Sequence, residues 1–422
     1  MTEDTARPTI SDFVVIDAES SGSLSQDLQK LLHAVRTHLG MDVAFVSEFR
    51  EGRRVFRAVD AARDNSPVKV GGGNPLEDSY CQSIVDGRLP ELIPDTAAIP
   101  GARKLRVMQT LSIGSYLGVP IKLQDGRVYG SFCCFGHTSD NSLNERDVKL
   151  MRVIADLVAN RVEQDLKAGN LRQDMQQRIR HMLAADSLAI VYQPIFDLKQ
   201  EAVSGFESLS RFNVTPARTP DVWFQEAAAV GQGVKLELKA IAKALAGMDI
   251  LPAEQYVSVN LSPDSVASSE LDRVLKTAPL DRVVIEVTEH AVITRYEDLK
   301  KALAPLRERG VRVAVDDAGA GYASFRHILN LRPDFIKLDI SLTRDIDKDP
   351  ARRALAAALT AFGGETGAQI VAEGVETSAE LKALRALGIS KAQGYYLGRP
   401  VPLATALELC APGRPKLSGF TG

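Results

Sequence analysis

The sequence predicts two domains in tandem, a mixed α+β domain with an antiparallel sheet and then a C-terminal α/β barrel. Three observations support this prediction. The chain has 422 residues, which is more than a single hydrophobic core usually serves. Alternating strand-like runs and a hairpin signal occupy the region up to about residue 165. After residue 188, eight short apolar runs alternate with helical stretches, which is the pattern of strands joined by crossover helices.

The first domain begins with an amphipathic helix, whose apolar residues are Leu24, Leu28, Leu31, Leu32, Val35 and Leu39. Gly40 is placed to end this helix. The alternating runs DVAFVSEF and RRVFRAVD predict strands, and a helix is expected from Ser79 to Val85. The run SYLGVPIKLQDGRVYGSFCCF predicts a hairpin that turns at Asp125-Gly126, because this dipeptide readily takes positive φ angles. The predicted domain covers residues 21–165, after a flexible N-terminus at 1–20.

A long helical segment is predicted between the two domains, with residues 166–186 as the linker. From Asn144 to about Leu188 turn residues are scarce, and apolar residues keep a heptad-like stripe. Gly169-Asn170 interrupts the pattern, so the segment is either two helices or one helix with a weak point. A parallel coiled-coil dimer and burial against its own domain explain the stripe equally well. We expect a homodimer.

The second domain is predicted for residues 187–410, with a flexible tail at 411–422. Its β-rich runs are AIVYQPIFDL, VSGFESLSRF, YVSVNLS, VVIEVTE, VRVAVDDAG, DFIKLDISL, QIVAEGV and AQGYYLG. Segments with helical spacing, such as EDLKKALAPLRERG, join most of them. The first two runs are too close together for a crossover helix, so an antiparallel hairpin is the alternative there.

Composition and charge limit the class of function. Hydrophobic residues at 45% and charged residues at 25% are typical of a soluble globular protein, and the net charge of -3 gives no basic surface for bulk nucleic acid. The start MTEDTARPTISDF lacks the pattern of a signal peptide, and no apolar run approaches the ~18 residues of a membrane span. We therefore expect a cytoplasmic protein whose four cysteines, without CxxC spacing, are reduced.

Polar residues interrupt the apolar runs of the second domain near their ends: Glu207, Asn260, Glu286, Asp316, Asp317, Lys337, Glu373 and Gln393. In an α/β barrel the strand ends meet at one mouth. Any one of these residues is most simply a cap or a salt bridge, but buried carboxylates cost several kcal/mol each unless they are neutralised. One lysine cannot balance five carboxylates. The set therefore predicts a site for hard divalent cations, Mg²⁺ or Mn²⁺.

These motifs resemble the EAL family of cyclic di-GMP phosphodiesterases, which are bacterial signal-transduction hydrolases, from about Ser187 to Pro402. The naming motif stands as Glu207-Ser208-Leu209 within GFESLSRF, where Ser replaces the usual Ala. The other motifs follow in the family's order: VNLSP, EVTEH, DDAGAGYASF, PDFIKLD, VAEGVET and QGYYLGRP. The resemblance implies a cyclic di-GMP substrate, which two ions and a water would open to linear pGpG.

The resemblance also implies roles for single residues. Glu207, Asn260, Glu286 and Asp316 would hold one ion, and Asp316, Asp317 and Glu373 the other. Lys337 would lie beside the attacking water, and Gln393 would hold that water or the metal shell. Arg211 would grip a substrate phosphate with its planar fork of donors. The remaining implied positions are Gln193 and Leu209, which would contact guanine and ribose, and Glu289, which would anchor the loop after the paired aspartates.

The first domain resembles a GAF domain over roughly Leu24 to Leu166, chiefly in DSYCQSIVDGRLPELIPD and GVPIKLQDGRVYGSFCCFG. GAF domains sense small ligands, light through a bound tetrapyrrole, or redox state, and many act as dimerisation and relay modules. The resemblance implies that an unidentified signal at this domain regulates the barrel. Cys81 could be a chromophore-binding or redox thiol, but a small buried hydrophobe is the simpler interpretation, as it is for Cys133 and Cys134.

The match departs from the family in one loop. Active members usually read DDFGTGYSS where this chain reads DDAGAGYAS, with Ala318, Ala320 and Ala323 in place of an aromatic residue and two hydroxyls. Each lost hydrogen bond costs about 1 kcal/mol, so reduced or conditional activity is one expectation. The alternative function is a catalytically silent barrel that binds cyclic di-GMP or a protein and signals by conformation. The retained carboxylates and lysine favour the enzyme.

Overall fold

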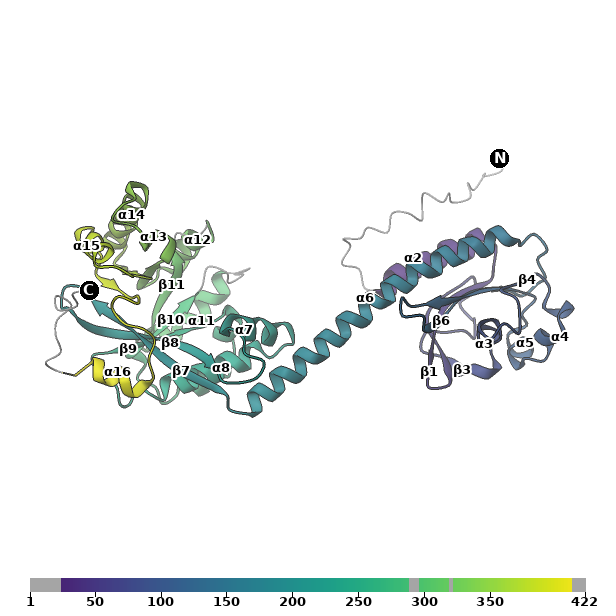
Figure 1. The fold of residues 1–422 in the computed structure, drawn as a ribbon, viewed down its shortest axis with the longest axis horizontal. Helices are drawn as coiled ribbons and strands as arrows, with labels where there is room; N and C mark the ends of the chain where they lie inside the picture. Colours follow the sequence, from purple (N-terminus) through teal and green to yellow (C-terminus); the bar gives the residue numbers. More distant parts are fainter. Residues whose placement is uncertain (1–23, 288–295, 319–321, 412–422) are drawn as a thin grey trace. The chain divides into compact units, whose positions relative to one another are not determined.

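The structure is a computed structural model, and it describes residues 24–287, 296–318 and 322–411 (Figure 1). The chain divides after Leu171 into two compact units. Each unit has its own hydrophobic core, and the first is built around an antiparallel sheet while the second is a closed barrel. The predicted fold class is therefore confirmed for both parts of the chain.

The first unit contains a six-stranded sheet in the order β3-β2-β1-β6-β5-β4, with antiparallel pairing throughout. Its strands are β1 (Val43–Arg50), β2 (Arg53–Ala61), β3 (Gly73–Pro75), β4 (Leu92–Ile93), β5 (Ser115–Lys122) and β6 (Val128–Gly136). The hairpin β5–β6 turns at Asp125-Gly126, where Gly126 takes a φ of 84°, as the sequence predicts. Its helices are α2 (Leu24–His38), α3 (Tyr80–Val85), α4 (Pro100–Arg103) and α5 (Arg106–Leu111).

The sheet separates two apolar cores. On one face, Leu32 and Val35 of α2 pack with Met151 and Ile154 of the long helix α6 (Glu145–Ala184). On the other face, the short helices α3 and α5 cover aromatic residues of the strands. Helix α6 is continuous through Gly169-Asn170, so the two-helix alternative is wrong. None of the helices within residues 24–287, 296–318 and 322–411 has the length and hydropathy of a membrane span.

The second unit is a closed barrel in the order β10-β11-β12-β13-β14-β7-β8-β9. Strand β7 pairs antiparallel with both β8 and β14, and the other neighbours are parallel. The antiparallel hairpin of the first two runs is thus present. The strands are β7 (Leu188–Asp197), β8 (Ala202–Phe212), β9 (Tyr256–Asn260), β10 (Val283–Val287), β11 (Arg312–Ala318), β12 (Phe335–Leu338), β13 (Gln369–Ala372) and β14 (Lys391–Ala392).

Helices cover the barrel and carry the chain from one strand end to the next start. They are α7 (Pro220–Ala229), α8 (Gly233–Leu245), α9 (Pro263–Val266), α10 (Leu271–Leu275), α11 (Tyr296–Glu308), α12 (Tyr322–Leu331), α13 (Ile340–Thr343), α14 (Pro350–Thr366), α15 (Ser378–Ala386) and α16 (Leu403–Leu409). Because the parallel strands run the same way, their carboxyl ends open at one mouth. The last apolar run forms a strand only at Lys391–Ala392, so Gln393 directly follows a strand.

Candidate metal-dependent active site

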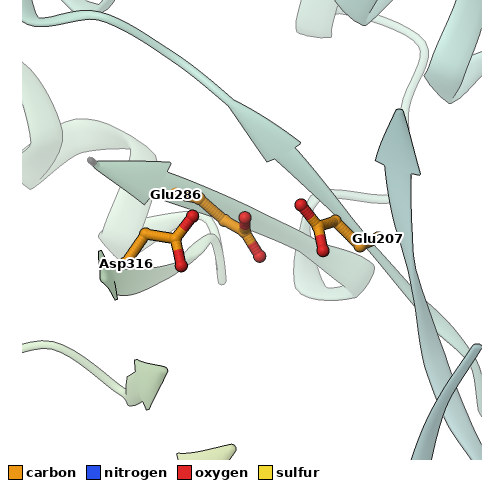
Figure 2. A group of neighbouring side chains, drawn as sticks. All are labelled: Glu207, Glu286 and Asp316. Carbon is orange, nitrogen blue, oxygen red and sulfur yellow. The ribbon is translucent and has the colours of Figure 1, made fainter. Parts of the chain in front are cut away.

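Three carboxylates from three strands of the barrel face one another at its mouth, and β9 (Tyr256–Asn260) lies between the first two of these strands. Glu207 lies on β8, Glu286 on β10 and Asp316 on β11, and Figure 2 shows their side chains converging. One carboxylate oxygen from each lies within 4.8 Å of the others. All three side chains are buried. This spacing is suited to a shared divalent cation, which takes oxygen ligands at 2.0–2.6 Å.

A second carboxylate group shares Asp316 with the first and adds Asp317 and Glu373. Neighbouring residues of a regular strand point to opposite faces, so Asp316 and Asp317 need a special backbone to approach the same point. Strand β11 provides it, because its register against β12 shifts between Val315 and Ala318. Asp317 also takes a left-handed φ of 56°, which is uncommon outside glycine. The bulge lets two consecutive carboxylates approach the same point.

Lys337 of β12 lies among these carboxylates. Its Nζ atom is 2.7 Å from Glu373, 2.8 Å from Glu286, 3.1 Å from Asp316 and 3.5 Å from Glu207. The side chain is 2% exposed. Lys337 therefore places one positive charge at the centre of the carboxylates named here.

Burial and mutual repulsion change the acidity of this cluster. Burial, together with the charges of Glu207 and Asp316, raises the pKa of Glu286 to about 8 in spite of Lys337. The pKa of Glu373 is also raised well above its ordinary value, first by burial and then by the same two carboxylates. Burial alone would lower the pKa of Lys337, but the surrounding carboxylates raise it well above the usual range. The cluster thus holds more negative groups than its lysine can neutralise.

Gln393 connects two of the carboxylates. Its Nε2 atom donates to Glu207 at 2.6 Å and to Glu373 at 2.9 Å. Its buried Oε1 atom has no hydrogen-bond partner within the described part of the chain. A buried carbonyl oxygen without a partner is costly, so it is suited to accept from a water or another donor at the site.

A cavity of about 350 Å³ is lined by Ser208, the residue that follows Glu207 on β8. Leu209, Ser210 and Arg211 line it as well, so consecutive residues of β8 contribute to its wall. Asn260, which is in register with Glu286, also lines the cavity and is exposed. Gln193 pairs across from Glu207 but its amide donates to the Gly398 carbonyl at 3.3 Å.

Sequence reasoning missed several polar residues near the site. Ser258 of β9 is buried and donates a hydrogen bond to Glu286, and its carbonyl accepts one from Ser208 at 2.7 Å. The Ser that departs from the family motif therefore joins β8 to β9. The signal for Ser258 was a polar residue inside the apolar run YVSVN. Asp221 and Glu237 on the cavity wall carry no such signal, since they lie on helices, where a polar residue does not interrupt an apolar strand run.

Part of the predicted loop falls outside the described residues. This holds for Glu289 and Ala320, and for the side chain of Ala323. Ala318 is described, and it is buried in the barrel core.

The donor set fits divalent cations of the Mg²⁺ or Mn²⁺ kind. Its members are carboxylate oxygens, which suit hard cations, and they form two overlapping groups that share Asp316. Neither group contains a histidine or a cysteine. Two cations would balance the charge that Lys337 leaves.

Comparisons with known proteins agree with this geometry. The family model for the EAL domain matches residues 176–400, and that for the GAF domain matches residues 22–163. The cyclic di-GMP phosphodiesterase NbdA of Pseudomonas aeruginosa is 32% identical over 246 residues, covering 56% of this chain and 31% of that protein. The probable cyclic di-GMP phosphodiesterase PdeD of Escherichia coli is 28% identical over 261 residues, covering 60% and 48%. This chain spans about a third to a half of the length of such curated relatives.

Solved structures share the fold. The PaMucR phosphodiesterase in its c-di-GMP complex is 27% identical with a TM-score of 0.51, and covers 56% of this chain and 100% of its own. The EAL enzyme Bd1971 with cAMP and cyclic di-GMP bound covers 88% of this chain and 93% of its own with a TM-score of 0.55, and at 16% identity it supports the fold alone. The carboxylate-lined barrel and these matches lead to one conclusion: the chain belongs to the EAL domain family, with a GAF domain preceding the barrel.

Proposed function

We propose that this protein is a metal-dependent phosphodiesterase that hydrolyses cyclic di-GMP to linear pGpG. The observation that carries the proposal is the convergence of Glu207, Glu286, Asp316 and Glu373 around one lysine, with Asp317 beside two of these carboxylates. The cavity of about 350 Å³ is large enough for much of a nucleotide, and its Arg211 offers a fork of donors to a phosphate. The relatives named as cyclic di-GMP phosphodiesterases support the choice of substrate.

In this proposal Glu207, Asn260, Glu286 and Asp316 hold one cation, and Asp316, Asp317 and Glu373 hold the other. Two such cations, when bound, supply Lewis acidity that activates a water and neutralises charge on the phosphoryl oxygens. Lys337 places a further positive charge beside the reacting phosphate. Gln393 fixes Glu207 and Glu373 through its Nε2 atom and accepts a hydrogen bond from the attacking water at Oε1.

The regulatory part of the proposal concerns the first unit and helix α6. We infer that a signal at the GAF domain controls the barrel, that the chain is a homodimer, and that it acts in the cytoplasm. Exposed apolar side chains along α6 support the dimer, because Val153, Leu157 and Leu171 fall on one helical face. Light scattering of Leu157→Glu beside the wild type tests it, and an unchanged mass would contradict it.

The test of the activity is hydrolysis of cyclic di-GMP by the purified chain with Mn²⁺ or Mg²⁺, with pGpG measured by chromatography. The wild type is expected to form pGpG, and a chelator to stop it. Glu207→Gln keeps the side-chain shape but removes a ligand charge, so turnover is expected to fall by at least about 100-fold. Glu308→Gln, an exposed site on α11, is the matched control and retains activity. Binding of cyclic di-GMP without any product would instead assign the barrel as a binding module.

A further inference from the structure

The core of the GAF unit contains two thiols in contact. Cys81 of α3 and Cys133 of β6 are both buried, and their Sγ atoms are 3.6 Å apart. Gly118 of β5 is in register with Cys133, and a Cβ atom there would lie 2.9 Å from the Cys133 sulfur. Glycine at this position therefore leaves the room in which the two sulfurs meet.

A buried arginine accompanies the thiols. Arg54 is 3% exposed, and its Nη1 atom is 3.0 Å from the Cys81 sulfur. Its Nε and Nη2 atoms donate to the amide oxygen of Asn74. Within the described residues, no carboxylate forms an ion pair with Arg54. A buried guanidinium needs a compensating negative charge, and the Cys81 thiolate is the group positioned to provide it.

The neighbouring groups shift the pKa values of the two thiols in opposite directions. Burial alone would raise the pKa of Cys81, but the hydrogen bond with Cys133 and the Arg54 charge lower it well below its ordinary value. The Tyr116 hydroxyl, 3.1 Å from the Cys81 sulfur, can donate to a thiolate. Burial and the neighbouring Cys81 raise the pKa of Cys133 well above its usual range. The geometry thus pairs a thiolate with a thiol, which is the arrangement of an attacking and a resolving cysteine.

We propose that Cys81 and Cys133 form a peroxide-sensitive dithiol in the GAF unit. The Cys81 thiolate attacks one oxygen of hydrogen peroxide, the O–O bond breaks, and hydroxide leaves to give a Cys81 sulfenic acid. The Cys133 sulfur then attacks the Cys81 sulfur, the S–O bond breaks, and the departing hydroxide takes up the thiol proton as water. The first hydroxide takes up from solvent the proton that Cys81 released on ionising, so the two cysteines lose two electrons in total and one peroxide becomes two waters.

The limited space near the two thiols restricts which oxidants can reach them. A cavity of about 10 Å³ lies beside Arg54 and Tyr116, both of which contact Cys81. This is about the volume that a single water needs, and neither Cys81 nor Cys133 lines the cavity. The tight packing excludes a bulky disulfide such as oxidised glutathione, so only a small oxidant of the size class of hydrogen peroxide can approach, by local movement of the lining side chains. Cys134 provides an internal comparison, since it packs in the opposite core and burial raises its pKa.

The test uses the full-length, fully reduced chain with hydrogen peroxide, followed by alkylation after unfolding and peptide mass mapping. The folded wild type is expected to lose two alkylatable thiols and to yield a Cys81–Cys133 cross-linked peptide. Oxidised glutathione at the same concentration is expected to act at least about tenfold more slowly. Cys134→Ser keeps the cross-link, whereas Cys133→Ser stops at a Cys81 sulfenic acid that dimedone traps.

The role of Arg54 is tested by rate. Arg54→Met is expected to slow cross-linking at pH 7 by at least about tenfold, because the thiolate is the reacting form. Circular dichroism verifies that each variant is folded. Asn74→Ala is a milder second variant, because it keeps the Arg54 charge, and it is expected to keep most of the cross-linking rate. Four free thiols in the folded, peroxide-treated wild type would overturn the proposal, as would cross-linking through Cys134 or Cys410. These readouts do not depend on hydrolysis by the barrel.

Discussion

Lys337 is buried among four carboxylates, and in the proposed mechanism it also lies beside the reacting phosphate. Its ammonium group lies within 3.5 Å of four carboxylates, and a neutral replacement would remove the positive charge that these four groups share. Lys337→Met is expected to lower the free energy of unfolding by about 3 kcal/mol and to lower turnover by at least about 100-fold. Urea unfolding and the pGpG assay measure the two effects.

Lys391 provides the matched control for this substitution. It is also buried, but it contacts none of the four carboxylates around Lys337 in the described ion pairs and instead pairs with Asp197 at 3.5 Å. Lys391→Met is expected to cost stability while turnover per folded molecule stays within about twofold. Equal losses of activity in the two variants would show that Lys337 acts only through the fold.

Arg211 belongs to substrate binding in the proposed mechanism. It is exposed and lines the cavity of about 350 Å³ together with Ser208 and Asn260. Arg211→Ala is expected to raise KM by about tenfold or more with little change in kcat, because a charge-assisted hydrogen bond to phosphate is lost. Arg211→Lys should recover only part of the loss, since lysine lacks the planar fork. Arg309→Ala, at an exposed ion pair with Asp272, leaves both constants unchanged.

At the scale of elements, the end of α6 is held to α7 by charge. Arg178 of α6 donates to Glu226 of α7 at 2.9 and 3.2 Å, and Arg218 pairs with the same carboxylate. Burial alone would raise the pKa of Glu226, but these arginines hold it below its ordinary value. A carboxyl with a lowered pKa stabilises the fold above its unfolded pKa, and this contribution is lost as pH falls through the folded pKa.

Glu226→Gln is therefore expected to destabilise the barrel unit by about 1–2 kcal/mol at pH 7. The difference between variant and wild type should shrink as the pH falls below about 4.5, the ordinary pKa of a glutamate, because both side chains are then neutral. Thermal unfolding of the variant and the wild type between pH 7 and pH 3 measures this difference in stability. A difference that is the same at pH 7 and pH 3 would contradict the assignment.

Most elements could be predicted from the sequence because their signals are local. The apolar run VVIEV and the Asp-Gly turn depend on neighbours along the chain, and so does the placement of Glu286 and Glu373 at strand ends. Glu207 differs from that expectation, because it lies in the middle of β8. The bulge at Asp316-Asp317 depends on pairing with another strand, which no local pattern reports. The position of Lys337 also depends on the tertiary structure. Its four carboxylate partners come from other strands and from the segment after β13, so no local pattern reports how close they lie to it.

At the scale of the whole molecule, two units with separate cores predict two unfolding transitions. Mn²⁺ binds the barrel in our proposal, so it should raise only the barrel transition, by about 2.7 kcal/mol at 100 times its Kd. Calorimetry with and without the ion measures this. In Asp316→Asn the shift should largely disappear, because Asp316 belongs to both carboxylate groups. A shift of both transitions would refute the assignment to the barrel.

The bulge in β11 also determines which changes in chain length the barrel can tolerate. Three residues of β11 span the distance that two residues of β12 span, from the pair Val315 and Ile336 to the pair Ala318 and Leu338. Deleting one residue at Asp316-Asp317 would restore regular pairing and leave a well-formed strand with a single carboxylate. A one-codon deletion there should therefore yield a folded barrel without a complete site, whereas the same deletion in β10 would turn its buried residues outward.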